Sequence, residues 1–433
     1  MKISLFQGIL FGVFGLAALI GLFVFATYTG KSSSSSGIGT VVIWGTLPKD
    51  SMNTMFTNLA QKDTTLKSVS YVQKDSATLP NDLASAIATG SAPDLVLDSQ
   101  ENLFALAKFI TPISSATLPA STFTSSFIEE GNLFASSGGY YGIPFLVDPL
   151  VLFSNRSILS SAGIAKPPAT WEALIGLVPN VAVLSTSRQI TRGLIALGTY
   201  SNVHNARGIL SALFLQTKLP ISAYSSGGVF TANLGSNSSN SGQPGKAVVG
   251  FYTQFADSSK VSYTWNASLN DSQQAFLSGD LALYLGYASE ARYFTAANPN
   301  LNFSVTPLPQ PATATTKSTY GLVYAFMIPN GAKNASGAYQ AAALLTNSAE
   351  QTVAASATGL APSALNNLSV VPSGSTAAVA YAEALYAKGW LSPAPAAVDS
   401  IFSSMINSVT SGRSTIDTAL VSAESSLSQL LQQ

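Results

Sequence analysis

The stretch YYGIPFLVDPLVLFSNRSIL, residues 140–159, decides the fold of this chain, because a single carboxylate interrupts its apolar run. Asp148 is the one charged residue between positions 140 and 155. A buried carboxylate is costly unless it has a partner or a ligand. Pro149 follows, and a residue before proline avoids helical backbone, so we expect two extended segments interrupted at Asp148. The stretch would then connect two lobes rather than lie as a strand buried within one sheet.

Length and composition bound the class of protein. A chain of 433 residues is longer than one core usually supports, so we expect two lobes. Only 9% of the residues are charged, 20 basic and 20 acidic, and this balance argues against nucleic acid as a partner. The absence of cysteine excludes disulfides, thiolate metal sites and a lipid-modified N-terminal cysteine. His204 is the single histidine, so the chain has few of the side chains that usually bind zinc or act in acid–base catalysis. We therefore expect no metal and no cofactor.

Residues 1–30 predict a transmembrane anchor. No charged residue occurs from position 3 to position 30, and a bilayer crossing needs about 20 apolar residues. The apolar region of a signal peptide is only about 7–15 residues long, and FATYTG is a poor cleavage site, so we expect the anchor to be retained. A Ser/Gly linker, KSSSSSGIG at residues 31–39, follows and is of the flexible class. The expected location is the cell membrane, with a single pass and the remaining chain extracellular.

Strand-like and helix-like segments alternate after the linker. Apolar runs of five or six residues predict strands, and apolar residues three and four apart predict helices between them. The strands are expected at 40–45, 69–74 and 93–98, and the helices at 49–63 and 79–90, with Gly90 ending the second helix. This β-α-β-α-β order is typical of a mostly parallel sheet covered by helices. The first lobe is therefore predicted to be α/β.

The carboxyl ends of these strands are the expected place for a ligand, as in other open sheets of this kind. Trp44 and Asp98 lie at two such ends, and Tyr287 follows the later strand LALYLG at residues 281–286. These side chains are candidate ligand contacts on position alone.

A series of motifs, in order, resembles the extracellular solute-binding proteins of ABC importers. The segments are VVIWG, GSAPDLVLDSQENLFALAKFITPIS, GYYGIPFLVDPLVLFSNRSILSSAGIAKPPATWEAL, QAFLSGDLALYLGYASEARYFTAANPNLNFSVTPLPQP, GAYQAAALLT, ATGLAPSAL and SGRSTIDTALVSAESSLSQLL. They span roughly residues 40–430, and the third is the most specific. Within the family, the chain is most similar to the sugar-binding group that includes the maltose/maltodextrin-binding protein.

The resemblance implies a two-lobed periplasmic-binding-protein-like fold, α/β in class, with a hinge of crossover strands and a cleft that closes on its ligand. Lobe 1 would comprise residues 40–147 and 308–360, and lobe 2 residues 148–307 and 361–433.

The resemblance also implies site residues. Asp148 would line the cleft and accept hydrogen bonds from sugar hydroxyls, although a hinge aspartate satisfied by backbone amides is the alternative. Trp44 and Tyr287 would stack on sugar rings, or else pack within a lobe. Asp98 and Glu101 are either ligand contacts or caps of the helix that follows them. Trp265 is a further cleft candidate, but its flanking segment does not align clearly.

The function that the resemblance implies is a non-enzymatic receptor, without catalytic residues. It would capture a sugar or oligosaccharide and deliver it, as a monomer, to the permease subunits of an ABC importer. No nucleotide-binding loop is present, so ATP hydrolysis would belong to another subunit. A neutral polyhydroxylated ligand is favoured over an ionic one, because the chain has few charges.

Two alternatives remain open. A surface polysaccharide hydrolase would need two carboxylates about 5–10 Å apart, for which Asp98, Glu101 and Asp148 are candidates. A ligand-sensing surface interaction protein would use the same lobes and a signalling partner.

Overall fold

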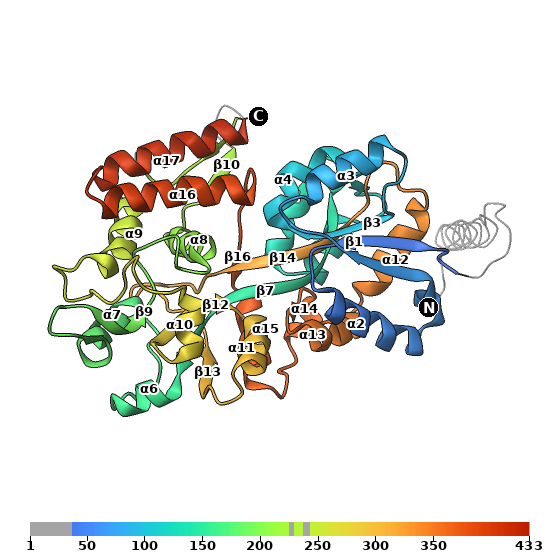
Figure 1. Ribbon diagram of the computed structural model, residues 1–433. Helices are drawn as coiled ribbons and strands as arrows, with labels where there is room; N and C mark the ends of the chain where they lie inside the picture. The colour runs from blue at the N-terminus through green and yellow to red at the C-terminus, as the bar shows by residue number, and fades with distance from the viewer. Residues whose placement is uncertain (1–36, 225–228, 237–242, 433) are drawn as a thin grey trace, which may run out of the picture.

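The computed structural model describes residues 37–224, 229–236 and 243–432. Figure 1 shows two lobes side by side, with strands β7 and β14 running from one into the other. The predicted membrane anchor and residues 31–36 of the linker lie outside the described residues. Within those residues, no helix combines the length and the apolar character that a membrane crossing requires.

Lobe 1 is built on the predicted alternation of strands and helices. Its strands are β1 (Val41–Gly45), β2 (Val69–Gln73) and β3 (Leu95–Ser99), and its helices are α2 (Lys49–Lys62), α3 (Leu79–Ala88), α4 (Leu103–Leu106), α5 (Ala120–Ser126), α12 (Ala335–Leu345), α13 (Ser348–Thr358) and α14 (Leu365–Leu368). The short strands β4 (Ile113–Ser114), β5 (Ala135–Ser136) and β6 (Gly139–Tyr140) form a small separate sheet. Strand β1 pairs in parallel with both β2 and β3, which confirms the α/β prediction for this lobe.

Lobe 2 contains most of the remaining elements. Its strands are β8 (Val183–Leu184), β9 (Ile190–Ile195), β10 (Ser222–Tyr224), β11 (Phe230–Ala232), β12 (Leu281–Tyr287) and β13 (Phe303–Thr306). Its helices are α6 (Arg156–Ser161), α7 (Trp171–Val181), α8 (Ala206–Gln216), α9 (Pro244–Thr253), α10 (Ser272–Ser278), α11 (Glu290–Ala297), α16 (Pro395–Thr410) and α17 (Ile416–Leu431). Near the junction of the lobes lie β7 (Gly142–Asn155), β14 (Thr319–Met327), β15 (Ala361–Pro362), β16 (Ala387–Lys388) and α15 (Ser375–Ala384).

One continuous sheet passes through both lobes, in the order β2-β1-β3-β14-β7-β12-β9-β8. The first part of β7 pairs with β14, up to Pro149 opposite Gly321, and the second part pairs with β12, beginning with Leu150 opposite Tyr287. The two lobes are thus joined through strands whose partners change at Asp148 and Pro149.

The expected interruption at Asp148 and Pro149 is wrong, because β7 is one uninterrupted strand in which every residue is buried. The carbonyl of Pro149 accepts a hydrogen bond from the amide of Ala288, just beyond the end of β12. In an antiparallel pair a residue's N–H and C=O point to the same side. The missing N–H of Pro149 therefore faces Ala288, beyond the last paired residue of β12, so the missing bond falls at the end of this ladder rather than within it.

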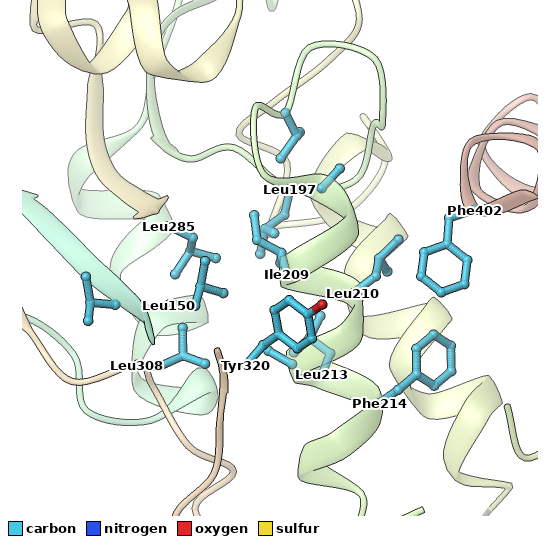
Figure 2. Packing of buried hydrophobic residues seen from close by; sticks show 14 of the residues in the cluster. Leu150, Leu197, Ile209, Leu210, Leu213, Phe214, Leu285, Leu308, Tyr320 and Phe402 are labelled. Carbon is cyan, nitrogen blue, oxygen red and sulfur yellow. The ribbon is translucent and has the colours of Figure 1, made fainter. Parts of the chain in front are cut away.

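Apolar side chains are buried in both lobes, and the larger buried cluster extends from lobe 2 to Leu83 and Val96 of lobe 1. In lobe 1, Met52, Met55, Phe56 and Leu59 of α2 are buried on one face, as the sequence spacing predicts. In lobe 2, Phe153 of β7 lies with its ring centroid 5.2 Å from Phe294. Figure 2 shows α8 between the residues of the sheet and Phe402 of α16, with Tyr320 of β14 lying against the helix. Helix α8 is therefore held from both sides, so the side chains at its ends have fixed positions.

Candidate ligand-binding site between the lobes

An ion pair joins the two lobes. Glu101 lies in the turn Gln100–Asn102 at the carboxyl end of β3, and Arg207 lies in the first turn of α8. The Arg207 guanidinium donates to the Glu101 carboxylate through Nε at 3.1 Å and through Nη2 at 2.8 Å. The Tyr320 hydroxyl donates to the same carboxylate at 2.6 Å. A two-bond pair of this kind fixes orientation as well as distance.

The other side of Arg207 faces α16. Its Nη1 pairs with the carboxylate of Asp399, and the Tyr200 hydroxyl donates to that carboxylate at 2.6 Å. The side chain of Arg207 is 23% exposed, so the guanidinium lies mostly out of water between two carboxylates. The two carboxylates therefore compensate the positive charge of Arg207, whose burial at the junction would otherwise cost free energy.

The turn that carries Glu101 is fastened to β14 by its neighbour Gln100. The Gln100 amide donates to the Gly321 carbonyl at 2.9 Å and accepts from the Val323 amide at 2.7 Å. The buried Gln100 side chain thus bonds to the backbone of β14 as a neighbouring strand would. These bonds fix the position of the adjacent Glu101 at the crossover.

Asp148 is satisfied by protein groups. Its carboxylate accepts from the Ser289 hydroxyl at 2.5 Å and from the Ser289 amide at 3.1 Å. Burial raises the pKa of Asp148 to about 7, although the bonds from Ser289 lower it. These contacts tie β7 to the residue preceding α11.

Asp98 also has protein partners on both carboxylate oxygens. It accepts from the Thr46 hydroxyl at 2.9 Å, from the Ser99 amide at 2.8 Å and from the Asn102 side chain at 2.8 Å. Burial raises the pKa of Asp98 to about 6, and these hydrogen bonds lower it. The carboxyl group organises the turn that contains Glu101.

The three aromatic candidates differ in their surroundings. Tyr287 is half-buried and lies beside Arg207 and Asp399. Trp44 is half-buried with the Lys74 ammonium 3.9 Å from its ring centroid, so a cation covers one face of the ring. Trp265 is 1% exposed and donates to Asn202 in the core of lobe 2, which leaves no ring face open to a ligand in this conformation.

A hollow of about 350 Å³ opens in lobe 2, beside Arg207 and Tyr287. We call it the acidic hollow, and its lining includes Tyr200, His204, Arg207, Asp271, Tyr287 and Asp399. Its volume lies within the range of small-molecule sites, and hydroxyl, imidazole and carboxylate groups converge in it. Such groups accept hydrogen bonds from the hydroxyls of a solute or donate hydrogen bonds to them. Among the residues that the structure describes, no group of three or more potential ligands could hold a metal ion.

Arg207, Tyr320 and Asp399 were not predicted from the sequence. Arg207 is the one charged residue in the apolar helix ARGILSALFLQ, which is the same signal that singled out Asp148. Its partner Glu101 is 106 residues away along the chain, so no local pattern indicates the pair.

Comparison with known proteins decides the family. Residues 56–389 match the family model described as bacterial extracellular solute-binding protein. The chain belongs to the bacterial extracellular solute-binding proteins. These proteins are receptors rather than enzymes, so the prediction of a non-enzymatic protein is confirmed and the hydrolase alternative is set aside.

Solved structures of other solute-binding proteins have the same fold. A cyclo/maltodextrin-binding protein complexed with maltotetraose has a TM-score of 0.71 at 16% identity, covering 93% of this chain and 99% of that one. The maltose/maltodextrin-binding domain from Bdellovibrio bacteriovorus, bound to maltotriose, has a TM-score of 0.67 at 16% identity, covering 91% and 100%. An ABC transporter solute-binding protein from Thermotoga lettingae TMO, bound with α-D-tagatose, has a TM-score of 0.67 at 18% identity, covering 91% and 100%. Among curated proteins, no sequence matches the chain. The two-lobed fold predicted for this solute-binding protein is thereby confirmed.

Proposed function

We propose that this solute-binding protein captures a sugar or oligosaccharide between its lobes and delivers it to an ABC permease. The observation that carries the proposal is the two-bond pair between Glu101 of lobe 1 and Arg207 of lobe 2, beside a hollow that Arg207 and Tyr287 line. Sugar-bound relatives with this fold support the choice of ligand class.

Recognition would follow from exchange of hydrogen bonds. In the structure, Arg207 bonds to both the Glu101 and the Asp399 carboxylates. Sugar hydroxyls donate and accept, so a sugar in the cleft can take over individual bonds without leaving a charge unpaired. The half-buried ring of Tyr287 offers an apolar face for a sugar ring. Asp98 and Asp148 already have protein partners, so we assign them to holding the turn and the hinge.

We further propose that residues 1–30 anchor the protein in the cell membrane. The uncharged run from position 3 to position 30 exceeds the roughly 20 residues of a bilayer crossing. A receptor held near the membrane stays close to a permease. In membranes from expressing cells, the protein should resist carbonate extraction, and the lobes should be digested by protease added outside intact cells. Release by carbonate would overturn the anchor and leave sugar binding untouched.

The test of sugar binding is a thermal-shift panel on the full-length protein in detergent. The panel contains mono- and oligosaccharides, amino acids and short peptides, because these classes separate the possible solutes. A ligand at about 100 times its dissociation constant adds ~2.7 kcal/mol to the stability of the folded state. We expect a sugar to raise the melting temperature and to be recovered intact. A shift with amino acids or peptides alone would refute the sugar proposal.

A further inference from the structure

A second, larger hollow lies at the other end of α8. It has a volume of about 880 Å³, and we call it the lysine hollow, with a lining that includes Lys218, Phe230, Lys317, Tyr386, Lys388 and Trp390. Glu129 and Leu133 of lobe 1 also line it, so both lobes contribute walls. The hollow is therefore part of the junction that the hinge opens and closes.

Aromatic and aliphatic side chains form its walls. Tyr386 is 37% exposed and Phe230 is half-buried. Phe230 stacks on Phe104 of lobe 1, with centroids 6.2 Å apart and ring planes at 16°. Trp390 is held in place because its Nε1 donates to the Ser211 hydroxyl at 3.1 Å. The exposed ring of Tyr386 is suited to the apolar face of a sugar ring, whereas Trp390 is 3% exposed and packs behind the wall.

Three lysines surround these walls, in a chain with only 20 lysines and arginines. The Lys218 ammonium donates to the Thr315 hydroxyl at 2.9 Å, which leaves its charge uncompensated. The Lys317 ammonium lies 5.6 Å from the Tyr386 ring centroid. Lys388 pairs with Glu129 at 2.7 Å, but the Glu129 side chain is 78% exposed, so water weakens this pair.

The acidic groups nearby do not cancel this charge. Glu130 is 4% exposed, and burial raises its pKa to about 8, so the carboxyl is mostly protonated at neutral pH. Burial raises the pKa of Glu383 to about 7, and the group accepts a hydrogen bond from the Leu308 amide. The rim of the lysine hollow therefore carries a net positive charge.

The two hollows lie along one face of α8. Arg207 lines the acidic hollow and Leu215 lines the lysine hollow, and Ser211 lies between them on the same helix face. Eight residues of helix span about 12 Å, which is the scale of a short oligosaccharide. Gly389, in the wall of the lysine hollow, lies close to Gln100, the neighbour of Glu101. Ser211 is 0% exposed and accepts the hydrogen bond from the buried Trp390, so buried side chains separate the two hollows in this conformation.

We propose that the lysine hollow holds a sugar ring that bears a carboxylate, so that the natural ligand is an acidic, uronic-acid-containing oligosaccharide. This inference rests on the proposed function. The sugar ring lies against the exposed ring of Tyr386, and its carboxylate lies among Lys218, Lys317 and Lys388. The sequence favoured a neutral ligand because the chain has few charges, whereas the fold gathers three of its lysines at one place.

The test is isothermal titration calorimetry of the full-length protein in detergent with paired trisaccharides. Trigalacturonate, trimannuronate and cellotriuronate are compared with galactotriose, mannotriose and cellotriose. We expect one acidic sugar to bind at least tenfold more tightly than its neutral counterpart, and to lose much of that advantage in 0.5 M salt. In Lys218→Gln and Lys317→Gln we expect the acidic sugar to bind about fivefold more weakly. Lys62→Gln, at the far end of α2 in lobe 1, is the matched control and should change nothing.

Two results would overturn the inference, and they are distinguishable. In the first, a neutral sugar binds tightly, its acidic counterpart binds no better, and the lysine substitutions have no effect. This result rejects the acidic ligand and leaves the proposed function standing. Failure of every sugar in the set and in the thermal-shift panel removes the proposed function together with the inference.

Discussion

Arg207 of α8 and Glu101 of the turn after β3 form a two-bond ion pair that joins the lobes, with the Glu101 side chain only 9% exposed. Removing one partner of a buried pair is expensive, since it leaves the other charge without compensation. Here Asp399 remains as a second partner of Arg207, which limits the loss. The pair therefore holds the lobes together in the conformation that the structure describes.

Glu101→Gln should open the lobes. The amide keeps an acceptor for Tyr320 but loses the charge that Arg207 faces, and we expect a loss of about 2 kcal/mol in the free energy of unfolding. Small-angle scattering of the full-length protein should show a larger radius of gyration, and urea unfolding measures the energy. Lys246→Gln is the control, because its pair with Asp417 has side chains 46% and 56% exposed and contributes little. Equal effects of the two substitutions would show that the pair does not hold the lobes.

Glu130→Gln should change how stability depends on pH. Burial raises the pKa of Glu130 from 4.5 to about 8, and its Oε1 has no hydrogen-bond partner among the residues that the structure describes. The folded state binds more protons than the unfolded state between these values, so the wild-type protein loses stability as pH rises from about 4.5 to 8. Gln does not titrate, so the variant should gain stability relative to wild type over that interval. Urea unfolding at pH 5, 7 and 9 checks this, with Asp50→Asn, at an exposed carboxylate of α2, as the control. Parallel pH curves for wild type and E130Q would contradict the prediction.

Ser289→Ala should weaken the attachment of β7 to lobe 2. The variant loses the hydroxyl that donates to Asp148 at 2.5 Å and leaves a buried carboxyl with one partner fewer. We expect a loss of about 1–2 kcal/mol in the free energy of unfolding. Ser278→Ala is the control, because the Ser278 hydroxyl bonds at an exposed helix end, and it should change the free energy of unfolding by less than about 0.5 kcal/mol.

Asp148→Asn should leave the sugar Kd within about twofold, because we assign Asp148 to the hinge. A much larger change in Kd would make Asp148 a ligand contact.

Local patterns were sufficient for the elements of lobe 1. The four apolar residues of α2 are spaced for one helix face and are buried there. Gly90 ends α3 because its φ of +67° lies in the left-handed region that glycine adopts without strain. Such signals act over a few residues, so the sequence carries them directly.

Tertiary contacts explain what the sequence did not predict. The preference of proline for interrupting regular structure is a local property of Pro149. Whether its missing N–H interrupts the strand depends on where β12 ends, and β12 begins 132 residues later in the sequence. Trp265 has the residue type of a cleft aromatic, yet only the packing of lobe 2 determines that its ring is buried. The residue boundaries expected for the lobes, and the roles expected for the site residues, stay predictions.

Gly208→Ala and Gly176→Ala form a matched pair that tests whether Tyr287 lines the bound sugar. Both glycines lie within helices, where alanine is favoured by roughly 0.5–1 kcal/mol. A Cβ at Gly176 meets no heavy atom within 4 Å, whereas a Cβ at Gly208 would lie 2.6 Å from the Tyr287 hydroxyl oxygen. We therefore expect G176A to raise the free energy of unfolding and to leave the sugar Kd unchanged. G208A should displace Tyr287 and weaken sugar binding by about tenfold or more, measured by calorimetry, because the ring can no longer stack in the acidic hollow. If both variants bind sugar as the wild type does, the ligand does not contact Tyr287, and the acidic hollow loses its place in the proposed site.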